Sequence, residues 1–209
     1  MYLLHQFNSD HTSYRTDHVD ALLDEGIKAG LFDKMIVVIP NSSENSWWTG
    51  EWEKMITEEL IPLIDGKYRT INDPRYRLTV GCSMGGQGAY AVALRNPDYF
   101  TGAVSFFGAF SFGAENSPNA IASKEPVEYL KSYALYFICG NQDSYGFGAP
   151  AIQLHQQRTS WVSPTAPSLK TAATTARSMC PSSRRVWLTP APTCTIENLG
   201  PTKTCSSCS

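Results

Sequence analysis

The stretch that most constrains the fold spans residues 76–90, where glycine, serine and glycine occupy positions 81, 83 and 85. The apolar residues at 78, 80 and 82 predict a short buried strand, and residues 87–95 predict a helix. A Gly-x-Ser-x-Gly sequence between strand and helix is typical of a nucleophile elbow, a sharp turn that lifts the serine hydroxyl clear of a sheet. The alternative is a turn of small residues that only lets a helix and a strand pack closely.

The elbow interpretation makes Ser83 a candidate nucleophile. The helix that follows points its unpaired N–H groups at the reacting atoms, so the backbone amide of Met84 becomes a candidate donor to a developing oxyanion.

Apolar runs and helical spacing alternate along the rest of the chain. Strands are predicted at 2–4, 35–39, 78–82, 103–107 and 134–139, and helices at 17–25, 51–65, 87–95, 125–130 and 150–157. This alternation predicts an α/β fold with a doubly wound, mostly parallel sheet. Residues 110–123, rich in glycine, serine and asparagine, are expected to form a long loop beside the site.

Composition says less about the function than these motifs do. A chain of 209 residues with 42% hydrophobic residues is large enough for one domain with a core. The net charge of -2 gives no reason to expect nucleic acid or a membrane surface as partner, and no apolar run is long enough to cross a bilayer. No signal peptide is recognisable, and the sequence leaves secreted and cytoplasmic locations equally open.

The two ends of the chain raise separate expectations. Met1 leads directly into a predicted core strand, so we expect strands that belong upstream to be missing. Cys82 and Cys139 lie in predicted strands and are expected to be buried thiols. The four cysteines of the last quarter match neither a disulfide framework nor a zinc site, and we expect no metal.

Two adjacent tryptophans, Trp47 and Trp48, lie in a polar loop after the predicted strand 35–39. One interpretation packs both indoles on the domain's own surface. The other makes them a platform for a sugar or phenolic group, because ligands bind beyond the carboxyl ends of strands in such sheets.

Five ordered motifs resemble the α/β-hydrolase esterases of the esterase D and feruloyl esterase type. They lie at 2–5, 36–41, 59–62, 81–86 and 139–144, and the resemblance covers most of residues 2–157. It implies Ser83 as nucleophile, Asp143 as the acid that orients a histidine, and an oxyanion hole made by Met84 and the Gln6 or Phe7 region, without a cofactor. The chain departs from the family at Gln6, where glycine is usual.

The resemblance does not extend to the catalytic histidine of the family. The family order is serine, acid, histidine, and of the four histidines only His155 follows Asp143. It lies inside a predicted helix, about three turns on from Asp143, and this helix should carry it away from Ser83. Because a serine without a base is a poor nucleophile, we expect impaired activity.

The tail from 158 to 209 has a different composition, dominated by Ser, Thr, Pro and Ala. It is either a low-complexity extension or a frameshifted translation. A shifted reading joins the third base of each codon to the first two bases of the next codon. In this reading residues 169–176 can encode Glu-Asn-Gly-Gly-His-Asp-Ser, and the histidine is encoded across the codons of Ala173 and Thr174. We therefore expect an incomplete esterase domain at 1–157, without its final strand and helix, and a non-native or disordered tail.

The sequence thus predicts a serine carboxylic-ester hydrolase scaffold acting on a small-molecule or carbohydrate-linked ester, with a feruloyl or acetyl ester of plant cell-wall carbohydrate favoured. Two alternatives stay open: a non-catalytic module that binds carbohydrate or a partner through Trp47 and Trp48, and a thioesterase or acyltransferase such as S-formylglutathione hydrolase. An unpaired sheet edge would also favour oligomerisation.

Overall fold

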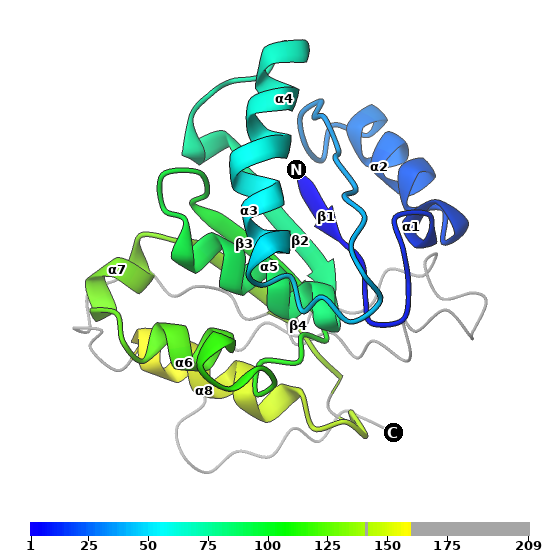
Figure 1. Cartoon of the computed structure of the whole chain (residues 1–209). Coiled ribbons are helices and arrows are strands. Elements are labelled where there is room, and N and C mark those ends of the chain that lie inside the picture. The colour runs from blue at the N-terminus through cyan, green and yellow to red at the C-terminus, as the bar shows by residue number, and fades with distance from the viewer. Residues whose placement is uncertain (141, 160–209) are drawn as a thin grey trace.

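A parallel sheet of four strands organises the computed structural model, which describes residues 1–140 and 142–159 (Figure 1). The strands are β1 (Tyr2–Leu4), β2 (Leu78–Cys82), β3 (Gly102–Phe106) and β4 (Ala134–Ile138), and they lie in that order across the sheet. Each neighbouring pair is parallel. The predicted α/β class is therefore confirmed, and four of the five predicted strands are present.

Helices connect the strands on both faces of the sheet. They are α1 (Ser13–Thr16), α2 (Val19–Lys28), α3 (Glu51–Lys54), α4 (Ile61–Lys67), α5 (Met84–Arg95), α6 (Pro118–Ala122), α7 (Val127–Lys131) and α8 (Gly148–Thr159). Short 3-10 turns lie at Pro74–Tyr76 and Ala114–Asn116.

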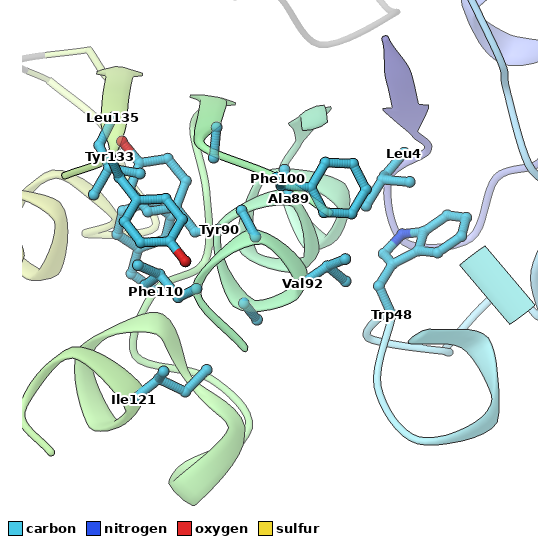
Figure 2. Packing of buried hydrophobic residues seen from close by; sticks show 14 of the residues in the cluster. Leu4, Trp48, Ala89, Tyr90, Val92, Phe100, Phe110, Ile121, Tyr133 and Leu135 are labelled. Carbon is cyan, nitrogen blue, oxygen red and sulfur yellow. The ribbon is translucent and has the colours of Figure 1, made fainter. Parts of the chain in front are cut away.

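Alternate residues of the strands feed two apolar clusters, one on each face. Tyr2 and Leu4 belong to the larger cluster, which holds most of α5, whereas Leu3 packs with Tyr14 and Val80 in the smaller one. Figure 2 shows the larger cluster, with Leu4 close to Trp48 on one side of α5 and Tyr133 and Leu135 on the other side. Helix α5 is buried along almost its whole length, so the elbow is held by the centre of the core.

The strand predicted at 35–39 is wrong except at one residue. Val38 forms a single parallel bridge with Tyr2, through bonds from the Leu3 amide to the Val38 carbonyl and from the Val38 amide to the Met1 carbonyl, both 2.9 Å. Met35 and Ile36 remain more than a third exposed. The apolar run therefore lies at the border of the sheet and is not covered on both faces, which a central parallel strand requires.

The stretch 110–123 is more ordered than the predicted long loop. It contains the 3-10 turn and α6, which begins with Pro118 as its first residue. The Ser117 side chain accepts a hydrogen bond from the Ala120 amide at 3.2 Å, which is the usual N-cap arrangement. The Ser-Pro pair was the local signal for this helix.

The helix predicted at 51–65 extends to Lys67. It consists of α3 and α4, joined without interruption by a π-helical segment, Met55–Leu60. Pro62 lies just after this segment. Proline has no N–H to donate to the carbonyl one turn back, and its ring crowds that carbonyl. The wider π-helical turn before Pro62 accommodates both the missing hydrogen bond and the ring.

Helix α8 continues to Thr159, two residues past the expected end of the domain, and Arg158 donates to the Tyr133 carbonyl at 2.6 Å. The rest of the proposed frameshifted tail lies outside the described residues, so that hypothesis stays a prediction. No helix in the described ranges is long and apolar enough to cross a membrane. Association through a sheet edge also stays a prediction.

Candidate active site

Ser83 sits between β2 and α5 in the turn that the sequence predicts. Its backbone has φ 53° and ψ -116°, a combination that non-glycine residues rarely adopt. The turn is held by a bond from the Ser83 amide to the Phe106 carbonyl at 2.9 Å and by the Gln87 and Ala109 amides, which both donate to the Ser83 carbonyl. The serine is partly exposed, as a nucleophile must be. Such strain is stored where the surroundings enforce it, often at catalytic positions.

Two glycines make this turn possible because there is no room for a side chain at either position. A Cβ at Gly81 would lie 2.2 Å from the Gly85 carbonyl oxygen, and one at Gly85 would lie 1.9 Å from the Leu4 carbonyl oxygen. Both obstacles are backbone atoms. The glycines therefore bring the start of α5 into direct contact with the end of β1.

Asp143 follows β4, two strands away from the elbow. Cys82, Phe106 and Ile138 are in register across β2, β3 and β4, so Ser83 and Asp143 leave the same edge of the sheet with β3 between them. This is the edge at which ligands bind in parallel α/β sheets.

The Asp143 carboxylate is fixed by the loop that leads into α8. It accepts bonds from the Tyr145 amide at 3.1 Å and the Phe147 amide at 2.5 Å. The Cys139 thiol also points at it, with 3.6 Å between sulfur and oxygen. Burial, and then the Asp143 carboxylate, raise the pKa of the Cys139 thiol to about 11. Cys139 and Cys82 are both partly exposed where full burial was expected.

The two predicted oxyanion donors lie on segments that touch. Met84 is the first residue of α5 and is fully buried. The Leu4 and His5 carbonyls pack against Gly85, and Gln6 follows directly. Gln6 is not among the residues with positive φ, so its backbone does not require the glycine usual in related esterases.

The four histidines lie on segments other than the elbow. His5 is fully buried, with Nδ1 bonded to the Gln6 carbonyl at 2.9 Å and Nε2 engaged by Ser42 at 3.0–3.2 Å. His11 and His18 lie near α1 and α2. His155 is seven residues into α8, about 10 Å along the helix, and its ring contacts Phe137 at 6.5 Å. Burial, and then Arg158, lower the pKa of His155.

The tryptophan pair is divided between the core and the surface. Trp48 is fully buried and belongs to the main apolar cluster (Figure 2), so it packs inside the domain and not on its surface. Trp47 is partly exposed and stacks on Phe112, with 5.5 Å between ring centres and 5° between planes. A ligand platform therefore stays a prediction for Trp47 alone.

Sequence reasoning missed a row of aromatic side chains that continues from Trp47. Phe7 contacts Trp47 at 6.4 Å, Phe112 contacts Phe147 at 6.0 Å, and Phe147 stacks on Tyr145 at 5.4 Å. Phe7, Phe112 and Tyr145 are half or more exposed. The sequence did contain one indication of this row: three of the loops that carry these rings follow β1, β3 and β4, at the edge of the sheet that carries Ser83.

In the described ranges, no three His, Cys, Asp or Glu side chains converge as metal ligands.

Comparison with known proteins finds similarity to esterases. The model of the Esterase family matches residues 2–167. The chain is 28% identical over 153 residues to an endo-1,4-beta-xylanase/feruloyl esterase of Xylanibacter ruminicola, covering 69% of this chain but 20% of that protein. The chain thus spans about a fifth of the length of this curated relative.

Solved structures share the fold. A ferulic acid esterase superposes with a TM-score of 0.68 at 25% identity, covering 76% of this chain and 71% of the other. FphF of Staphylococcus aureus, a fluorophosphonate-binding serine hydrolase, superposes with a TM-score of 0.61 at 21% identity, covering 75% and 70%.

Proposed function

The chain belongs to the Esterase family, and from this premise we propose that Ser83 is the nucleophile and Asp143 the acid of a carboxylic-ester hydrolase site. The observation that carries the proposal is the backbone of Ser83, held at φ 53° between β2 and α5. A serine that only filled a turn would not need this costly conformation.

The reaction that this arrangement supports is acyl transfer. The Ser83 hydroxyl oxygen bonds to the ester carbonyl carbon and its proton passes to a base, while the carbonyl oxygen becomes an oxyanion facing the Met84 amide. The alcohol then leaves with a proton, and water releases the acid from the acyl-enzyme. Asp143 would orient the base.

We infer that this base is missing, so that turnover is impaired. Both nitrogens of His5 are engaged, and His155 lies well along α8 beside Phe137. Positioned proton transfer contributes roughly 10²–10⁴-fold to such reactions, and turnover should be lower by a factor of that order.

For the substrate we propose an ester of plant cell-wall carbohydrate with a feruloyl or an acetyl group. The aromatic row from Phe7 to Tyr145 supports the feruloyl choice, because flat rings stack on a phenolic acyl group. The names of two relatives, a xylanase/feruloyl esterase and a ferulic acid esterase, agree with it.

A second candidate is a module that binds carbohydrate or phenolic groups without catalysis. The exposed rings of Phe7 and Phe112 favour this function, and so does the missing base inferred above. It predicts binding that survives Ser83→Ala.

Labelling with a fluorophosphonate distinguishes the two candidates. We expect one adduct on Ser83 by peptide mass spectrometry, no adduct in Ser83→Ala, and full labelling in Ser123→Ala, which removes an exposed serine at the end of α6. Turnover of 4-nitrophenyl acetate should be weak and should depend on Ser83. No labelling, with feruloyl-sugar binding intact in Ser83→Ala, would favour the binding module; rapid Ser83-dependent turnover would show that a base is present.

A further inference from the structure

The indole of Trp48 is directed at the backbone that precedes the second oxyanion donor. Its Nε1–H donates to the His5 carbonyl at 3.1 Å, and both residues are fully buried. In a planar trans peptide the C=O and the N–H point in opposite directions. Fixing the His5 carbonyl therefore fixes the direction of the Gln6 N–H.

From this geometry we propose that Trp48 is a positioning residue, which holds the Gln6 amide in place as a donor to the oxyanion formed at Ser83. The proposal rests on the esterase function proposed above. Trp48 itself touches no reacting atom and acts through the His5–Gln6 peptide.

The next peptide along the loop is fixed by the His5 side chain. Its Nε2 accepts a bond from the Ser42 amide at 3.2 Å, so the ring proton is on Nδ1 and is donated to the Gln6 carbonyl at 2.9 Å. The Trp48 amide donates to the Ser46 hydroxyl at 3.2 Å, and this hydroxyl is 2.8 Å from that of Ser42. Trp48 and His5 therefore belong to one buried network, where low polarity strengthens each bond.

The surroundings leave the indole little freedom to move. A Cβ at Gly88 of α5 would lie 2.5 Å from the Trp48 Cβ, so the side chain rests directly on the helix backbone. The His5 ring packs edge-on against the indole, with ring centres 4.9 Å apart. Figure 2 shows the indole beside Leu4 of β1, on the same side of α5.

The loop adopts an unfavourable backbone at this point. Trp47 has φ 50° and Trp48 has φ 53°, so two consecutive bulky residues are left-handed, a conformation that costs on the order of 1 kcal/mol or more at each residue. The same turn brings the Trp47 amide to the Met84 sulfur at 3.3 Å. The tryptophan pair thus contacts both segments that carry the oxyanion donors, which gives the strain a function.

The test uses the full chain and two phosphorylating reagents, diethyl 4-nitrophenyl phosphate and its P=S analogue, with imidazole added as a diffusible base. In each reaction a bond forms from phosphorus to the Ser83 oxygen and 4-nitrophenolate leaves. An oxyanion hole accelerates the P=O reagent far more than the P=S reagent, because sulfur is a weak acceptor. The ratio of the two rates therefore reports the donors, and a general loss of structure does not reproduce this change in ratio.

In Trp48→Phe, which keeps a ring but loses the N–H, we expect the P=O rate to fall by roughly tenfold or more and the P=S rate to change much less. Trp52→Phe is the matched control, since Trp52 is a partly buried tryptophan of α3 that packs against the same core; both rates should stay within about twofold of the parent, as for a residue outside the site. If Trp48→Phe does not fold, Trp48 is replaced by 3-benzothienylalanine, in which sulfur takes the place of the N–H.

Unchanged rates and an unchanged ratio in the Trp48 variant, with Ser83 labelled in the parent, would overturn the role of Trp48 and leave the esterase proposal standing. Failure of the parent to react at Ser83 would overturn both proposals.

Discussion

Single residues at the elbow show how completely one turn depends on the absence of side chains. Gly85 lies against the Leu4 carbonyl, and Ser83 is forced into a strained backbone between that contact and β3. The backbone atoms around Gly85 belong to the central sheet and cannot move apart without breaking the pairing of β1 with β2. The same contact that shapes the site is therefore a requirement of the fold.

Gly85→Ala should consequently lower the free energy of unfolding by at least about 3 kcal/mol, because overpacking against backbone has no cheap relief. Gly66→Ala is the control: Gly66 lies in α4, and a Cβ added there would have no neighbour within 4 Å, so alanine should raise stability by roughly 0.5–1 kcal/mol. Urea unfolding of both variants measures the difference. Equal stability of the two variants would refute the packing argument.

At this scale the sequence predicts some residues and not others. The turn at Ser83 could be predicted from local sequence, since its strand, turn and helix lie within the eighteen residues 78–95. The burial of Trp48 is not local, because it depends on His5 and Gly88, which are more than 35 residues away on either side. Nothing near position 48 distinguishes an indole that anchors the loop from one that faces solvent.

Among the elements, α4 is joined by a charged pair to the residue that precedes β2, at the end of this strand opposite Ser83. The Arg77 guanidinium donates to the Asp65 carboxylate at 2.5 Å, and their side chains are only 7% and 16% exposed. Asp65 also accepts from the Thr70 hydroxyl at 2.7 Å. The pair therefore links the helix, its following loop and the start of the elbow strand.

Asp65→Asn should lower the free energy of unfolding by about 2 kcal/mol, because it leaves a largely buried guanidinium without its counter-charge. Asp73→Asn is the matched change, since Asp73 pairs with Arg75, whose side chain is 76% exposed. An exposed pair of this kind contributes little, and asparagine still caps the 3-10 turn. Unfolding of both variants in guanidinium chloride measures the two changes in stability. Equal losses would contradict the argument that burial makes the Asp65–Arg77 pair the more important one.

The elements themselves were predictable where sequence and environment agree. The apolar runs of β1 to β4 and the helix after Ser83 lie where the pattern places them. The run at 35–39 has the same composition but lies at the border of the sheet, and composition does not report the neighbours that a strand needs. Helix α6 was not predicted because the glycine and asparagine content of residues 110–123 indicated a loop, although the Ser-Pro pair at 117–118 is typical of a helix start.

For the molecule as a whole, strand order determines which parts of the site come from nearby sequence. Strands β2, β3 and β4 are neighbours both in sequence and in the sheet, and they carry Ser83 and Asp143. Strand β1 pairs with β2 across more than 70 residues and brings Gln6 and His5. The alternation of strands and helices predicts the class of sheet, whereas the aromatic row from Phe7 to Tyr145 depends on loops meeting across that edge.

This order leads to a prediction about refolding. Distant pairings cost more chain entropy to close, so amides of β2, β3 and α5 should gain protection before those of Tyr2–Leu4 in pulse-labelled hydrogen exchange. Simultaneous or earlier protection of β1 would contradict it.

A nascent chain therefore carries Tyr2–Leu4 for a long interval before β2, the strand that pairs with it, has been made. Until then only the single bridge to Val38 is available among the described residues. The ribosome must release residues up to at least 82 before Tyr2–Leu4 can pair, and during that interval three buried side chains remain accessible to chaperones. Residues 2–4 therefore reach their place in the sheet after residues that are translated later, and the adjoining loop that carries Gln6 becomes ordered with them.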